Sequence, residues 1–234
     1  MKMPKFRLLQ DFFSLFFPRV CLACGDVLKQ GEETICLSCH FHLPQTDYHK
    51  DPENPVAKHF WGRCQVENAA AFYLFQKGTK VQHLLHELKY HSKTEIGIKV
   101  GQLYGEVLKT AEGFKTVDLI LPIPLHPQKK RQRGFNQSDL FAEGLSKTME
   151  TPWSGDILQR VKFSNTQTKK DRFQRWENVE QIFEVARPEN IEGKHVMIVD
   201  DVITTGSTME ACINEISKVE GCKVSVATMA CAQF

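Results

Sequence analysis

Val196-Met-Ile-Val-Asp-Asp-Val-Ile-Thr-Thr-Gly-Ser-Thr-Met209 is the stretch that decides the fold of this 234-residue chain. Its first four residues are apolar and mostly β-branched, which predicts a strand covered on both faces within a parallel sheet. Asp200 and Asp201 follow at the carboxyl end of that strand, and an amphipathic helix is expected from Met209. Since ligands of open α/β sheets bind outside the carboxyl ends of the strands, this segment predicts a binding site.

The turn between the acidic pair and the helix is suited to a phosphate group. Its residues are Thr204, Thr205, Gly206, Ser207 and Thr208. Free backbone N–H groups at a helix amino terminus and nearby hydroxyls form an anion site, and Gly206 permits a positive φ. The two carboxylates would instead accept hydrogen bonds from sugar hydroxyls or bind a hydrated cation. The segment therefore predicts a site for a phosphorylated sugar, and a loop that only caps the helix is the alternative.

This segment resembles the loop that binds phosphoribosyl pyrophosphate (PRPP) in type I phosphoribosyltransferases. The resemblance implies that Asp200 and Asp201 hold the ribose hydroxyls, and that Thr204 through Thr208 hold the 5′-phosphate. It also implies an α/β fold with a parallel sheet flanked by helices.

The length and composition fit one α/β domain with a small accessory module. Of the residues, 41% are hydrophobic and 25% are charged. We expect an amino-terminal helix and metal module over residues 1–55 and the α/β domain over residues 56–234. The net charge of only +2 gives no global argument for nucleic-acid binding, so any such function must come from local clusters of basic residues.

The amino-terminal segment imitates a signal peptide, with a basic start followed by an apolar run. Gln10 and Asp11 interrupt that run, and no small-residue cleavage site follows before Cys21. A short amphipathic helix is predicted instead, with an inward face of Leu8, Leu9, Phe12, Phe13 and Phe16. No stretch is long enough to span a bilayer, so we expect a cytoplasmic protein.

Four of the eight cysteines have the spacing of a zinc site. They form two Cys-x2-Cys pairs separated by eleven residues: Cys21, Cys24, Cys36 and Cys39. This layout is typical of a four-thiolate knuckle with structural Zn²⁺, whereas a pair of disulfides is disfavoured in a reducing cytoplasm. The other cysteines lack ligand spacing and are expected to be small buried hydrophobic residues. They are Cys64, Cys212, Cys222 and Cys231.

The middle of the chain predicts a linker, a strand and two helices. Residues 43–55 have the prolines of a linker, and residues 69–75 have the apolar run of a strand. Helices are expected over 80–89 and 98–108. In the first of these, His83 and His86 lie at helical spacing near Glu87, where a surface pair is favoured over a metal site. Lys89, Tyr90 and Lys93 follow as a small basic and aromatic cluster.

A second half-site is predicted after the next strand, over residues 117–124. Residues 125–137 read as a basic loop before a helix through Leu140 and Leu145. Because this loop leaves the same sheet edge as the acidic pair, the two should face each other. Backbone N–H groups and arginines would match a pyrophosphate, while a solvated loop is the alternative. The residues expected to bind PRPP here are Leu125, His126, Arg131 and Arg133.

Residues 160–175 are also basic, with interleaved rings at Phe163, Phe173 and Trp176. Cations that follow a phosphate backbone and rings on which bases stack are typical of a groove for single-stranded DNA. Anchoring of the rings in the core is the alternative. The residues expected to contact nucleic acid are Lys129, Lys130, Arg131, Arg133, Arg160, Lys162, Lys169, Lys170, Arg172 and Arg175.

The order of these motifs resembles that of the ComF family over nearly the whole chain. The shared features are the four-Cys knuckle, Arg131-Gln-Arg-Gly-Phe-Asn-Gln137, Arg160 with Gln167, and the PRPP loop. The resemblance implies a type I phosphoribosyltransferase fold, PRPP binding and a role in uptake of single-stranded DNA during natural transformation, with DNA-uptake or recombination proteins as partners.

Two classes of function follow from this reading. As a binding module, the protein would bind PRPP and DNA. As an enzyme, it would be a nucleobase phosphoribosyltransferase of nucleotide salvage, with Mg²⁺ and the basic loop stabilising pyrophosphate while Asp200 and Asp201 act on the ribose.

Overall fold

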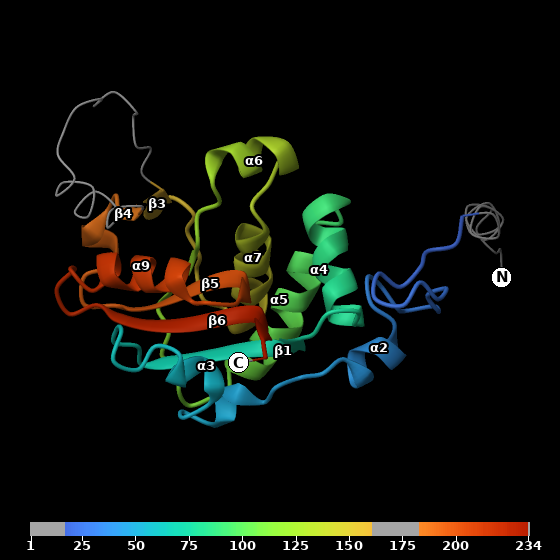
Figure 1. The fold of residues 1–234 in the computed structure, drawn as a ribbon, viewed down its shortest axis with the longest axis horizontal. Coiled ribbons are helices and arrows are strands. Elements are labelled where there is room, and N and C mark those ends of the chain that lie inside the picture. Colours follow the sequence, from blue (N-terminus) through green and yellow to red (C-terminus); the bar gives the residue numbers. More distant parts are fainter. Residues whose placement is uncertain (1–16, 161–182, 234) are drawn as a thin grey trace, which may run out of the picture.

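A computed structural model describes residues 17–160 and 183–233 (Figure 1). Its main sheet has four parallel strands in the order β1-β6-β5-β2. These are β1 (Asn68–Phe75), β2 (Leu119–Pro122), β5 (His195–Ile203) and β6 (Lys223–Ala232). A separate antiparallel pair consists of β3 (Leu158–Arg160) and β4 (Phe183–Val185). The structure thus confirms the predicted parallel sheet.

Strand β5 occupies the interior of the sheet, as its sequence predicts. It pairs with β2 on one side and with β6 on the other, and Val196 through Val199 are fully buried. The strand continues past the acidic pair to Ile203, because Val202 and Ile203 still pair with Ala230 and Cys231 of β6. The acidic pair therefore lies within the last part of the strand and is held by the sheet itself.

Helices cover both faces of the sheet. One face packs against α4 (Lys80–Tyr90), α5 (Glu95–Leu108) and α7 (Gln137–Met149). The other face packs against α3 (Pro55–Lys58) and α9 (Ser207–Ile216). Helices α5 and α9 begin three and two residues before the predicted starts at 98 and 209.

Glycines bring α5 and α7 unusually close together. A Cβ atom on Gly101 would lie 2.4 Å from the carbonyl oxygen of Phe141, and one on Gly144 would lie 2.2 Å from that of Ile98. Both distances are far below van der Waals contact, so the two backbones touch only because these positions lack a side chain. This contact fixes α7, whose first turn contributes to the pocket described below.

The four-cysteine module packs against α4 at one end of the molecule (Figure 1). It includes the short helix α2 (Leu37–His42). The following residues, predicted as a linker, are structured and run along the edge of β1. Leu74 donates its N–H to Pro44 at 2.8 Å, and Thr46 donates to Phe72 at 3.0 Å. A 3₁₀ turn, η1 (Tyr48–Lys50), follows before α3.

The basic segment predicted as a loop contains a helix, so that prediction was wrong in part. Helix α6 (Pro127–Arg133) begins with proline, which suits the first helical position because no acceptor is needed there. The ring Nδ1 of His126 accepts the N–H of Gln128 at 3.2 Å, and Gly134 ends the helix with φ of 80°. Another 3₁₀ turn, η2 (Pro188–Asn190), precedes β5.

Three further predictions have different outcomes. Cys212 and Cys231 are buried as expected, whereas Cys64 and Cys222 are only partly buried. The predicted helix with Leu8 and Phe16 lies outside the described residues. Within the described residues, no helix is both long and apolar enough to cross a bilayer.

Candidate functional site

A pocket of about 370 Å³ lies at the carboxyl ends of β2 and β5, where the acidic pair meets the basic segment. Its basic lining residues are Lys89, His126, Lys129, Arg133 and Arg160. Its other lining residues are Ile123, Pro124, Leu125, Asn136, Gln137, Ser138, Asp200, Asp201 and Thr208. The pocket therefore brings two carboxylates together with a group of basic side chains.

Asp200 is held by neighbours on two elements. Its Oδ1 accepts a hydrogen bond from the Ser138 hydroxyl of α7 at 2.8 Å and another from the N–H of Asp201 at 2.8 Å. Burial, followed by the adjacent charge of Asp201, raises the pKa of Asp200 to about 7. Near neutral pH this carboxyl group is thus partly protonated, so it can either donate a hydrogen bond to a hydroxyl or accept one from it.

Asp201 is paired with Lys89 at the end of α4. The Lys89 ammonium lies 3.0 Å from Oδ1 and 2.9 Å from Oδ2 of Asp201. The two side chains are only 24% and 12% exposed. Because Lys89 neutralises the Asp201 carboxylate, the pocket lining carries less negative charge than two unpaired aspartates would give it.

The turn before α9 presents its hydroxyl groups to solvent. Thr204, Thr205, Ser207 and Thr208 are exposed, and Thr208 also lines the pocket. Gly206 adopts φ of 69° directly before the helix. The first turn of any helix has N–H groups without intrahelical acceptors, so this end of α9 suits an anion.

The outer side of this turn is fixed by the α3 segment. The carbonyl oxygen of Thr205 contacts the ring of His59 and accepts a hydrogen bond from Arg63 at 3.3 Å. Arg63 also forms an ion pair with Glu210 in the first turn of α9. These contacts fix the position of the turn.

On the basic side of the pocket, α6 and the start of α7 are tied together. Arg133 donates to Oε1 of Gln137 at 2.8 Å, and its guanidinium lies 5.5 Å from the Tyr90 ring centroid. Asn136 donates to the carbonyl oxygen of Ile123 at 3.0 Å, which joins α7 to the strand end. These bonds orient Arg133 as one wall of the pocket.

The predicted site residues divide into three groups. Leu125, His126 and Arg133 line the pocket, as does Arg160, which was expected to bind nucleic acid. Lys130 and Arg131 are exposed on α6 and are not among the lining residues. Lys129 also lines the pocket, and the remaining predicted nucleic-acid contacts, Lys162, Lys169, Lys170, Arg172 and Arg175, lie outside the described residues.

Six lining residues were not predicted as site residues from the sequence: Lys89, Ile123, Pro124, Asn136, Gln137 and Ser138. Gln137 is 1% exposed, and its Nε2 has no hydrogen-bond partner among the described residues. Buried amide donors are almost always satisfied, so this group is suited to a ligand or a water molecule in the pocket. The available signal was weak: Gln137 and Ser138 open a helix directly after the basic segment.

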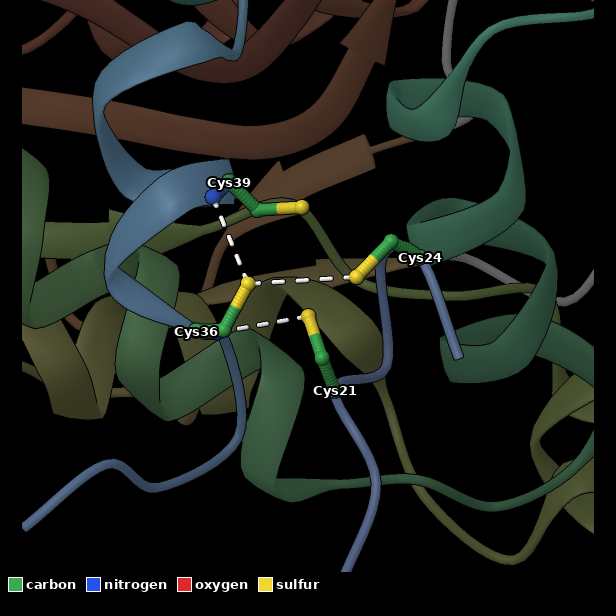
Figure 2. Close-up of side chains that lie close together, drawn as sticks. All are labelled: Cys21, Cys24, Cys36 and Cys39. Atoms are coloured by element: carbon green, nitrogen blue, oxygen red, sulfur yellow. Dashed lines mark hydrogen bonds between the residues drawn. The ribbon is translucent and has the colours of Figure 1, made fainter. Parts of the chain in front are cut away.

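The four-cysteine cluster has the geometry of a tetrahedral metal site (Figure 2). All four sulfur atoms lie within 4.8 Å of one another, and those of Cys24 and Cys36 are 3.8 Å apart. Zn–S bonds of ~2.3 Å in a tetrahedron require sulfur atoms ~3.8 Å apart. None of the four forms a disulfide.

Backbone N–H groups support this assignment. Cys21 accepts hydrogen bonds from the N–H groups of Cys36 at 3.2 Å and Ala23 at 3.4 Å. Burial raises the pKa of the Cys21 thiol, but these bonds, together with hydrogen bonds from Cys24, outweigh burial and lower the pKa to about 7. Burial raises the pKa of Cys39 above its ordinary value, so a cation is needed before all four can ionise. The cluster therefore fits structural Zn²⁺.

Comparison with known proteins assigns the family. Residues 140–232 match the phosphoribosyl transferase domain, a range that contains the acidic pair and the turn before α9. Over 198 residues the chain is 35% identical to the DNA utilization protein YhgH of Escherichia coli O157:H7, covering 81% of this chain and 80% of that protein. The chain belongs to the ComF family. Two further ComF relatives are competence protein F of Haemophilus influenzae, at 28% identity over 213 residues (87% of this chain, 91% of that protein), and competence protein ComFC of Bacillus subtilis, at 33% over 216 residues (81% and 85%).

The similarity to solved structures is more distant. The chain matches the allosteric regulatory enzyme of purine biosynthesis with a TM-score of 0.43 and 18% identity. That match covers 62% of this chain and 30% of the larger enzyme, and no functional argument rests on it.

Proposed function

We propose that this ComF-family protein binds PRPP or a related phosphoribosyl ligand in the pocket, holds single-stranded DNA on the basic residues around it, and acts in DNA uptake or utilisation in the cytoplasm. The observation that carries the proposal is that Asp200 and Asp201 line one pocket together with a group of basic side chains. A phosphoribosyl ligand has the matching order of groups, with hydroxyls between two phosphorylated ends.

The ligand is proposed to lie across the pocket, from the start of α9 to α6. Its 5′-phosphate would bind the amino terminus of α9 at Thr208, and its ribose hydroxyls would meet Asp200 and Asp201. Its pyrophosphate would face Arg133 and Lys129, where a guanidinium can bind two oxygens at once. The donor of Gln137 would complete this side.

Mg²⁺ is expected to enter together with the ligand. Both carboxylate oxygens of Asp201 are engaged by Lys89, and Oδ1 of Asp200 already accepts two hydrogen bonds. Mg²⁺ commonly binds through substrate phosphates and keeps several waters. The oxygens of PRPP would therefore provide most of its ligands, and the acidic pair would act on the ribose.

The second candidate function is phosphoribosyl transfer to a nucleobase, favoured by the separation of a ribose side from a pyrophosphate side. A nucleobase nitrogen would form a bond to the anomeric carbon and release its proton, while the bond from that carbon to pyrophosphate breaks and pyrophosphate leaves with its electron pair. Asp200 and Asp201 would hold the ribose as positive charge develops, and Arg133 would stabilise the departing pyrophosphate. Formation of a nucleotide and free pyrophosphate from PRPP and a nucleobase would establish this function.

Binding of single-stranded DNA is supported by exposed cations on α6 next to the pocket and by the names of the relatives. Lys130 and Arg131 project from this helix, and Lys129 lies at the pocket wall. Each phosphate contact contributes about −0.7 to the slope of log K against log salt for single strands. Binding to DNA should therefore weaken steeply as salt rises.

Fluorescence anisotropy with a labelled oligonucleotide tests this part. Lys130→Glu with Arg131→Glu should weaken binding and flatten the salt dependence. Lys194→Glu is the matched control, because Lys194 is exposed directly before β5, at the opposite edge of the sheet. Equal binding by the α6 variant, the control and the wild type would exclude α6 as a DNA-binding surface.

A further inference from the structure

Three side chains with metal-binding atoms converge at the carboxyl end of α4, outside both the pocket and the cysteine cluster. They are His86, Glu87 and His91, and their candidate ligand atoms all lie within 4.8 Å of one another. His91 donates from Nδ1 to Oε1 of Glu87 at 2.7 Å. The rings of His86 and His91 have centroids 5.2 Å apart and stand nearly perpendicular, at 83°.

This ring arrangement matches that of two imidazoles on one metal ion. A tetrahedral ion bonded at ~2.0–2.1 Å to one nitrogen of each ring would place the two ring centroids roughly 5 Å apart. The observed 5.2 Å separation of His86 and His91 meets this requirement. A bound ion would replace the proton that His91 now shares with Glu87, and the 2.7 Å separation of Nδ1 and Oε1 would lengthen to ~3.3 Å.

The backbone holds these residues on a defined scaffold. The carbonyl oxygen of Glu87 accepts the N–H groups of His91 at 3.0 Å and Lys93 at 3.3 Å, which closes the end of the helix. Ser92 has φ of 54°, so the chain turns sharply just after His91. A helix carboxyl terminus carries partial negative charge, which favours a cation there.

Two neighbouring cationic side chains, Lys89 and Arg133, are engaged in contacts outside this cluster. Lys89 points to Asp201, and Arg133 lies over the Tyr90 ring from α6. The Glu87 side chain is 15% exposed and that of His91 is 54% exposed, so the carboxylate is sheltered while one side of the cluster faces solvent. An ion held here would keep at least one coordination position open.

We propose that His86, Glu87 and His91 form a binding site for a divalent transition-metal ion such as Zn²⁺ or Ni²⁺, distinct from the four-cysteine site. Two imidazoles and one carboxylate are ligands that suit these ions, whereas Mg²⁺ prefers oxygen ligands alone. The site uses His91 in place of His83, because His91 lies one helical turn after Glu87 and its Nδ1 bonds to that carboxylate. It depends on neither PRPP nor DNA, so it stands or falls independently of the proposed function.

The test is a titration of untagged protein whose cysteine site is already filled with zinc. Calorimetry with Ni²⁺ should show one further ion on the wild type. His86→Ala and His91→Ala should each weaken its binding by at least roughly tenfold, since even the loss of a residue that supports a metal ligand costs this much. His83→Ala is the matched control, as it removes an exposed histidine of the same helix that is not in the cluster.

Co²⁺ provides an independent spectroscopic readout of the ligands. The added ion should show visible absorption typical of nitrogen and oxygen ligands, without thiolate charge transfer. His86 and His91 are exposed, so the variants are expected to fold, and an unchanged midpoint of urea unfolding verifies this. Failure of the wild type to bind a further ion, equal binding by His86→Ala, or thiolate charge transfer would each overturn the proposal.

Discussion

Replacement of Asp200 by asparagine should stabilise the free protein. Asp200 has its pKa raised from 3.8 to about 7 by burial and by the charge of Asp201. The folded state therefore retains a proton that the unfolded chain has lost. Ionising this group above neutral pH costs folding free energy, and a neutral side chain of the same shape avoids that cost. The Oδ1 of asparagine can still accept the hydrogen bonds from Ser138 and the N–H of Asp201.

The pKa difference sets the magnitude. A shift of about three pKa units at about 1.4 kcal/mol per unit gives a maximum of about 4 kcal/mol. Because Asp200 lines a pocket open to water, which raises the local dielectric, we expect about half of this, ~2 kcal/mol.

The sign of the pH dependence follows from proton binding. Between the unfolded pKa near 4 and the folded pKa near 7, the folded wild type binds more protons, so its stability falls as pH rises through this range. Above that range the penalty is constant. The advantage of Asp200→Asn should therefore grow from about 1 kcal/mol at about pH 5 to about 2 kcal/mol at about pH 8.

Urea unfolding of both proteins at these two pH values measures the difference. Asp156→Asn is the matched control, because this exposed aspartate lies outside the pocket lining and should change stability little at either pH. The reasoning is refuted if Asp200→Asn is no more stable than the wild type at the higher pH, or if its advantage does not increase with pH.

Three other perturbations test the scaffold around the site. Gly144→Ala should destabilise by about 2–3 kcal/mol in urea unfolding, because its Cβ would lie 2.2 Å from a backbone oxygen of α5. Gly155→Ala, whose nearest contact is 3.6 Å, should change stability by less than ~0.5 kcal/mol, and a similar loss in both variants would contradict the packing argument. Lys89→Met leaves a largely buried carboxylate unpaired and should cost about 2 kcal/mol at neutral pH; an unchanged stability would mean that the pair is not formed in solution. Cys36→Ser should abolish binding of the structural zinc in a metal assay and increase hydrogen exchange in the module, while β5 stays protected; retention of a full equivalent of zinc would exclude the four-thiolate site.

Local sequence patterns predicted the elements in which buried residues follow a regular spacing along the chain. Val196 through Val199 are apolar without interruption, and all four are fully buried in the sheet. The cysteine pairs were equally clear, because their spacing reflects a local turn. Helix α4 followed from the periodicity of Val81, Leu84, Leu85 and Leu88, all of which are buried.

Strand β6 was missed because polar residues interrupt its apolar run. Ser225 and Thr228 are nevertheless fully buried. Ser225 is accommodated by a hydrogen bond between its hydroxyl and Nε2 of His195, at 2.8 Å. Such a partner lies on another strand, so no local pattern reveals it.

The pocket walls depended on tertiary contacts in the same way. Lys89 and Asp201 are far apart in sequence and meet only when the fold brings the end of α4 to the carboxyl end of β5. Ser138 reaches Asp200 because α5 and α7 approach closely at their glycines, which places the first turn of α7 at the strand end. Residues 125–137 were interpreted as a loop because Pro122 and Pro124 break the preceding strand, yet Pro127 occupies the first helical position, where proline is favoured.

Calorimetric titration of the zinc-loaded protein with PRPP and Mg²⁺ tests the phosphoribosyl site most directly. We expect the wild type and Asp156→Asn to bind one PRPP per chain, and the double variant Asp200→Ala, Asp201→Ala to show no binding. Absence of binding to the wild type, or equal binding by the double variant, would contradict the assignment of this pocket to a phosphoribosyl ligand.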